Sequence, residues 1–201
     1  MTAAVTLTLA TVGCDSGTAE PEPSASASSA GARFSGFAGP CPALGADAVR
    51  RLGVTAEGRP VPSTVPTGLG VTHLECAWGE PGTRPRILVT VSIHPDGFPP
   101  GDGDDNARRL FESIRAEAAE KVALTRTLPE RNTASGPTLV TVNAALDKLT
   151  QSTLVDNAVV TVVVEDRERS TGDADVELDD LEHRLAPTVD ELVGQVVAEL
   201  R

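Results

Sequence analysis

Apolar and polar residues alternate most regularly in the middle of the chain, where the pattern predicts two strands. In RILVTVSIH, residues 86–94, the apolar positions are Ile87, Val89, Val91 and Ile93. In VTHLECAW, residues 71–78, Leu74, Cys76 and Trp78 share one face in the same way. A period of two is typical of a half-buried strand. Because the turn-forming residues GEPGTRP separate the two segments, we predict an antiparallel hairpin.

Further strands are predicted in the second half of the chain. PTLVTVN, residues 137–143, is a short strand pattern, and QSTLV and AVVTVVVED flank the turn residues Asp156 and Asn157. That arrangement indicates a second tight hairpin. Residues 158–164 are apolar on both faces, which is typical of a central strand.

Two segments with helical spacing precede or interrupt these strands. In GADAVRRLGV we expect a short helix, capped by Asp47 or an earlier residue and ended by Gly53. In ARRLFESIRAEAAEKVAL, apolar residues recur at helical spacing, and Asp104, Asp105 or Asn106 is the expected N-cap. The apolar positions of this second helix are Leu110, Ile114, Ala118 and Val122.

The longest amphipathic pattern lies at the C-terminus. From residue 176 onward one stripe is apolar, and Pro187 within it predicts a kink or two abutting helices. The stripe comprises Leu178, Leu181, Leu185, Val189, Leu192, Val193, Val196 and Leu200. The order of elements predicts an α+β fold, with a largely antiparallel sheet, helices packed on one face and a long C-terminal helix. We assign residues 37–201 to this single domain.

Composition and charge exclude some partners. The 201 residues are 40% hydrophobic and 23% charged, which is an ordinary globular mixture. The formal net charge is −12. Because so acidic a chain repels phosphate backbones, we expect no nucleic-acid partner.

The N-terminus resembles a bacterial lipoprotein signal. AAVTLTLATV, residues 3–12, is uncharged and has the length of a signal-peptide apolar region, and Gly13 directly precedes Cys14. Thr11 stands where a lipobox prefers Leu, and no Lys or Arg precedes the apolar run, as expected if the true start codon lies upstream. We therefore interpret residues 1–13 as a signal peptide and Cys14 as the lipidation site.

The segment that follows, residues 14–36, is rich in Ser, Ala, Pro and Gly and predicts a disordered tether. On this interpretation the domain is held by its lipid anchor at the extracytoplasmic face of the cell membrane. With Cys14 acylated, two of the three cysteines remain. Cys41 and Cys76 are then either an oxidised pair, closing a loop of about 36 residues, or two buried thiols.

Several motifs together resemble a family of actinobacterial lipoproteins that carry a domain of unknown function. These are GPCPALGADAVRRLG, the later CAW, ARRLFESIRAEA, DNAVVTVVVED and the C-terminal helix. The family's pattern is Pro-Cys followed by Cys-x-Trp. The resemblance implies a cell-surface lipoprotein without an established activity, in which Cys41 and Cys76 form a disulfide and Trp78 is a core residue beside it.

Two metal sites are conceivable from the sequence. Asp102, Asp104 and Asn106 alternate as in a calcium-binding loop, but Ala107 and Ser113 occupy the positions that require Gly and Glu. We interpret this segment as a solvated loop and helix cap.

The second candidate for a metal is a zinc site. It would join His73, Glu75 and His94, provided that residue 73 pairs with residue 92 in the hairpin. We commit to neither metal, and expect no cofactor.

Catalytic motifs are not evident. The sequence contains no Gly-x-Ser-x-Gly elbow, His-Glu-x-x-His motif, Walker loop or dinucleotide-binding glycine pattern. The leading hypothesis is a non-catalytic domain that binds an envelope protein or a small ligand. The alternatives are a cell-envelope enzyme such as a hydrolase, and a structural accessory of a membrane complex.

Overall fold

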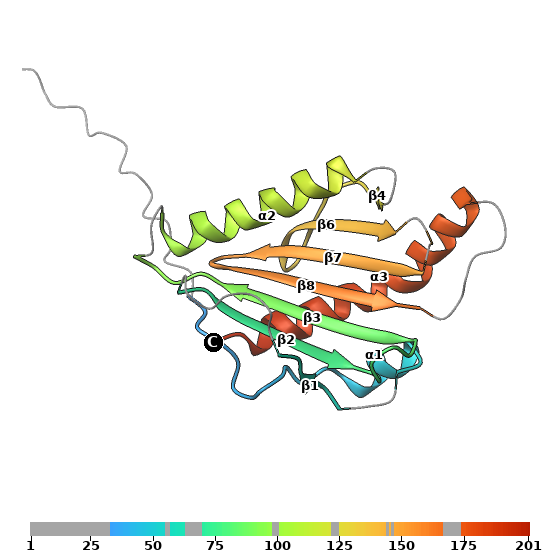
Figure 1. The fold of residues 1–201 in the computed structure, drawn as a ribbon, viewed down its shortest axis with the longest axis horizontal. Coiled ribbons are helices and arrows are strands. Elements are labelled where there is room, and N and C mark those ends of the chain that lie inside the picture. Colours follow the sequence, from blue (N-terminus) through green and yellow to red (C-terminus); the bar gives the residue numbers. More distant parts are fainter. Residues whose placement is uncertain are drawn as a thin grey trace, which may run out of the picture. The chain divides into compact units, whose positions relative to one another are not determined.

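An antiparallel sheet of eight strands organises the molecule (Figure 1). The computed structural model describes residues 33–54, 57–62, 70–97, 101–121, 125–143, 145, 147–166 and 174–201, the side chains of 174–177 excepted. The predicted signal peptide, most of the tether, Cys14 and Val122 lie outside these residues. Residues 31–201 cluster as one unit.

All strand pairs are antiparallel. The main path through the sheet is β1-β2-β3-β8-β7-β6-β4, and β5 also pairs with β6. The strands are β1 (Arg59–Pro60), β2 (Thr72–Trp78), β3 (Arg86–Ile93), β4 (Thr125–Thr127), β5 (Arg131–Thr133), β6 (Gly136–Asn143), β7 (Lys148–Val155) and β8 (Ala158–Glu165). Both predicted hairpins, β2–β3 and β7–β8, are confirmed.

The sheet is centred on β8, which lies between β3 and β7. Its residues Val159 and Val160 point to opposite faces, and both are almost completely buried. The prediction of a central strand at 158–164 is therefore confirmed. β8 is apolar on both faces because both faces are covered there.

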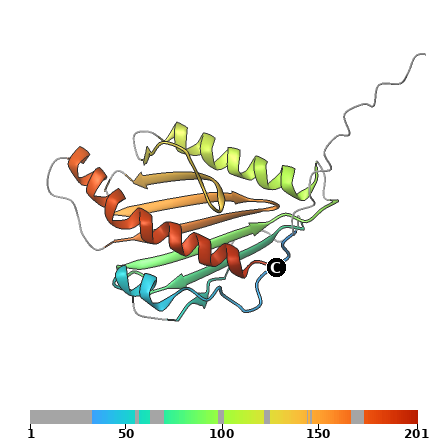
Figure 2. The ribbon, with the colours of Figure 1, turned by 180° about the vertical axis from the view of Figure 1, so that it is seen from behind.

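The first face is covered by α1 (Ala46–Arg51) and the long helix α3 (Ala174–Glu199), as Figure 2 shows. The predicted stripe of α3 packs against the alternate strand residues that point to this face, such as Val89, Val91 and Val160. Pro187 lies inside α3, which continues through it as one helix. Gly53, with a φ of 68°, follows α1 in the left-handed conformation that glycine tolerates.

The opposite face carries α2 (Gly103–Glu120), against which Leu139, Leu154 and Val159 pack. The α+β class, the antiparallel sheet and the long C-terminal helix are confirmed, but the helices lie on both faces rather than on one. The buried residues of α2 are Gly103, Ala107 and Phe111, so the stripe predicted for this helix lies at its margin. The N-cap is Asp102 rather than residues 104–106, and Asp96 Oδ1 accepts the first amide, Gly103 N–H, at 3.1 Å.

Residues 33–37 attach the start of the described chain to one end of the sheet. The Asn157 side chain accepts from Phe34 N–H at 2.9 Å and donates to the carbonyls of Phe34 and His94. Gly36 N–H donates to the carbonyl of Arg201 at 3.0 Å. Asn157 is 2% exposed, so it holds this junction in a dry environment. The expected tether therefore joins the domain beside the β7–β8 turn.

None of the helices in the described part of the chain is long and apolar enough to span a bilayer.

Candidate functional site

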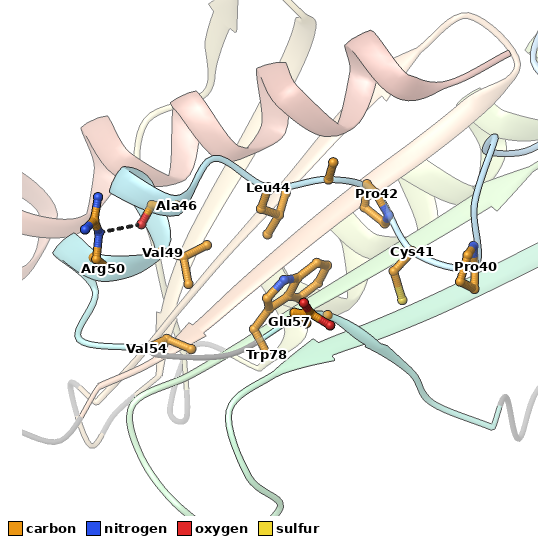
Figure 3. A pocket seen from close by; sticks show the side chains of 12 residues that line it. Pro40, Cys41, Pro42, Leu44, Ala46, Val49, Arg50, Val54, Glu57 and Trp78 are labelled. Atoms are coloured by element: carbon orange, nitrogen blue, oxygen red, sulfur yellow. Dashed lines mark hydrogen bonds between the residues drawn. The ribbon is translucent and has the colours of Figure 1, made fainter.

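A groove of about 520 Å³ lies beside the end of β2 (Figure 3). It lies between the segment that leads into α1, the residues before β1, and the last residue of β2. The lining residues are Pro40, Cys41, Pro42, Ala43, Leu44, Ala46, Val49, Arg50, Val54, Glu57, Gly58 and Trp78. Ten of these twelve are apolar or glycine, so the groove has the composition of a small-molecule site.

One wall is fixed by the disulfide between Cys41 and Cys76, whose Cα atoms are 5.8 Å apart. Cys76 is 2% exposed and pairs with Val89 in the sheet. The bond ties an irregular proline-rich segment to a central hairpin. The pairing implied by the family resemblance is thus present, and the alternative of two buried thiols is excluded.

The same wall is also held from α3. Gln195 accepts the N–H of Gly45, the residue before α1, at 2.8 Å, and Glu191 forms an ion pair with Arg51. Val49 packs into the main core from the same turn of α1. The groove therefore has one wall that is cross-linked, hydrogen-bonded and packed, which is what a preformed site requires.

Trp78 forms the floor of the groove and is 3% exposed. Gly58 lies so close to its indole that an added Cβ would come within 3.0 Å of Cζ2, Cε2 and Nε1. Only glycine fits here without a shift. The indole N–H donates to no residue that the structure describes, although buried indoles usually find an acceptor.

Two charged side chains line the groove. Arg50 donates from Nε to the Ala46 carbonyl at 3.2 Å and forms an ion pair with Asp47. Glu57 is exposed and has no ion pair or hydrogen bond within the described residues. The positive charge of Arg50 therefore has a counter-charge, and the negative charge of Glu57 has none in the part of the chain that the structure describes.

The three residues of the hypothetical zinc site are only partly brought together. His73 pairs with Ser92, as predicted, but its Nδ1 lies 3.1 Å from Ser92 Oγ. His94 follows β3, and burial lowers the pKa of its imidazole because the charged form loses hydration. Among the described residues, no group of three or more His, Cys, Asp or Glu side chains is arranged to hold a metal ion.

The Ser92–His73 contact is the closest approach to a catalytic pair. A serine nucleophile needs a base at this distance, a third group orienting that base, and a pocket for substrate. Within the described residues no carboxylate bonds to His73, and neither His73 nor Ser92 lines the groove over Trp78.

Sequence reasoning missed a polar cluster under α3. Gln151 is 0% exposed, donates to Asp190 Oδ1 at 2.8 Å and accepts from Arg131 at 3.2 Å. Arg131 also bonds Asp190 at 3.1 Å, and both side chains line a shallow groove along α3. The available signal was a polar residue at an inward-facing position of β7, which is rarely tolerated unless it is paired.

A buried charge at the turn before β7 was missed as well. Asp147 is 6% exposed, accepts from Asn143 at 2.7 Å and forms an ion pair with Arg84. The hydrogen bond and the nearby negative charge raise the pKa of Arg84 above its ordinary value. This cluster joins the β2–β3 and β6–β7 turns, and its groups satisfy one another, so it is structural.

No protein-family model, curated protein or solved structure matches the chain.

Proposed function

We propose that this protein is a lipid-anchored, non-catalytic binding domain at the extracytoplasmic face of the membrane, and that the groove over Trp78 holds its ligand. One observation carries the proposal. A cavity of about 520 Å³, with mostly apolar walls, is closed on one side by a disulfide and floored by a tryptophan whose N–H has no acceptor among the residues that the structure describes. Cavities that bind small molecules have this size and this mixture of apolar surface with a few polar groups.

The disulfide supports the extracytoplasmic part of the proposal. Such bonds persist in oxidising compartments and are rare in the cytosol of mesophiles. The resemblance to actinobacterial surface lipoproteins, through the Pro-Cys and Cys-x-Trp motifs, agrees with it. Lipidation of Cys14 supplies the anchor in this account.

The position of the tether fits a binding role. Phe34 is fixed beside His94, at the end of the hairpin where Thr72 pairs with Ile93. Trp78 pairs with Ile87 at the other end. Thr72 and Trp78 are six positions apart along β2, which corresponds to roughly 20 Å. On a membrane-anchored chain, the groove would lie away from the anchored end and remain accessible.

Binding at the groove is tested with the single tryptophan. Because the chain has one Trp and no Tyr, its fluorescence reports on the groove floor alone. The full chain with Cys14→Ser is titrated with 1-octanol, which has an aliphatic body and a neutral head. We expect a saturable change in Trp78 emission that Gly58→Ala abolishes, because the new methyl group displaces the indole. No saturable change would contradict the proposal.

The second candidate is an envelope hydrolase, which the Ser92–His73 contact favours. Covalent labelling of Ser92 by a fluorophosphonate, lost in His73→Ala, would support it over a binding role.

A further inference from the structure

The polar groups of the groove indicate what kind of head group its ligand carries. Trp78 offers one hydrogen-bond donor from the floor, and Glu57 offers a carboxylate. Gly58 lies against the indole and is bonded to Glu57 in the chain, which places the carboxylate at the same part of the lining. Figure 3 shows Leu44, Glu57 and Trp78 around this part of the groove.

The ion pairs around the groove show which charged side chain could pair with a ligand. Arg50 is paired with Asp47, and Arg51 with Glu191. Arg59 follows Gly58 but does not line the groove, and it donates to the Gly79 carbonyl at 3.3 Å. Glu57 is thus the charge of the lining that has no partner among the described residues. The net charge of −12 over the chain adds a long-range field of the same sign.

We infer that the ligand is a small amphiphilic organic cation. Its aliphatic body lies against Trp78, Leu44 and Val54, and its ammonium or related head pairs with Glu57. The volume of about 520 Å³ falls in the range of small-molecule pockets. This inference rests on the proposed function, because it specifies the chemistry of the ligand for the same groove.

The test compares three probes that share one body and differ only in the head: n-octylammonium, 1-octanol and octanoate. Each is titrated at pH 7 into the full chain with Cys14→Ser, and Trp78 emission is recorded. A unit charge about 4 Å from a carboxylate in water gains enough for about a fivefold difference in affinity. We expect octylammonium to bind at least about fivefold tighter than octanol, and octanoate to bind weaker than octanol.

Two controls isolate Glu57. Glu57→Gln should make octylammonium and octanol equal, whereas Glu80→Gln, which removes a carboxylate outside the lining, should leave the preference unchanged. High salt should reduce the preference of the unsubstituted groove, because exposed charges are screened. The salt series uses the protein without a groove substitution. It therefore shows whether the preference for octylammonium is electrostatic even if Glu57→Gln folds poorly.

The outcomes separate the two proposals. Saturable binding of octanol with no preference for octylammonium overturns the cationic ligand and leaves the binding groove intact. Octanoate as the tightest probe also overturns it, because Arg50 would then dominate. Tighter binding of the peptide acetyl-Leu-Lys-Leu-amide than of octylammonium overturns the small-molecule assignment in favour of a protein partner. No saturable change with any probe refutes the binding groove itself.

Discussion

Breaking the disulfide should lower the stability of the domain by about 4 kcal/mol. Cys41 and Cys76 are 35 residues apart, and the loop-closure entropy for that length is about 13 cal/mol/K, or about 3.8 kcal/mol at room temperature. With a urea m-value of about 2 kcal/mol/M, the unfolding midpoint should fall by about 2 M. Trp78 fluorescence follows the transition, because the residue lies two positions beyond Cys76.

Three samples separate the cross-link from the loss of the side chains. The full chain with Cys14→Ser is compared in its oxidised form, in its reduced form, and as the double variant Cys41→Ala/Cys76→Ala. The reduced form keeps both sulfur atoms, so it measures the cross-link alone. We expect most of the shift in the reduced form and a small further loss in the double variant. A reduced midpoint within about 0.5 M of the oxidised one would show that the cross-link contributes little to stability, contrary to this prediction.

Three further changes test the groove, the pH dependence and the N-terminal junction. Gly58→Ala should lower the free energy of unfolding in urea by about 1–3 kcal/mol, because the added methyl group clashes with the indole. Gly194→Ala is the control: the space around its added Cβ is open, so this helix substitution should raise the free energy of unfolding by up to about 1 kcal/mol. Burial lowers the pKa of His94 in the folded protein, so between the folded pKa and the ordinary value of 6.5 the unfolded chain binds a proton that the folded protein does not. The contribution of neutral His94 to the free energy of unfolding is therefore complete above pH 6.5, and it is lost as the pH falls from there toward the folded pKa. His94→Gln should flatten this part of a midpoint-against-pH curve, and His183→Gln at an exposed position should leave it unchanged; equal slopes in both variants would contradict the assignment. Asn157→Ala should cost about 2–4 kcal/mol and speed hydrogen exchange at the amide of Phe34, and unchanged exchange there would show that the side chain does not hold the junction.

The long strands and the register of the first hairpin could be predicted because their sequences carry an unambiguous period. His73 opposite Ser92 follows from the alternation of two segments that are separated by a short Pro/Gly turn. The three strands that were missed have only two or three residues each, which is too short for a period to show. These short strands form because a neighbouring strand offers unpaired backbone N–H and C=O groups. That depends on the folded arrangement and not on the local sequence.

The second helix layer was missed although its signal was in the sequence. Residues 158–164 are apolar on both faces, which predicts a central strand. The same pattern also requires something apolar on each side of the sheet, and α2 supplies it over Val159. The prediction placed all helices on the face that α3 covers. Amphipathicity alone shows that a helix packs against a sheet, and does not show which face of the sheet it covers.

The groove could be predicted only in part. The cysteine pattern indicated that the segment around Cys41 and the end of β2 lie together. Its other wall is formed by Val54, Glu57 and Gly58, which lie outside any helix or strand and whose surrounding sequence has no period. The close contact of Gly58 with Trp78 is a property of the folded chain, and so is the lack of a partner for Glu57 among the described residues. No spacing in the sequence could have indicated either one.

The anchor and the disulfide can be tested together by the mass of the Cys14 and Cys41 peptides, taken from host membranes without reducing agent. We predict that Cys14 carries a diacylglyceryl group and that the Cys41 peptide is linked to the Cys76 peptide. These masses would show that the domain is lipid-anchored and that the disulfide at the wall of the groove is formed. An unmodified Cys14 together with free thiols at Cys41 and Cys76 would contradict the anchor, the compartment and the fixed wall of the groove.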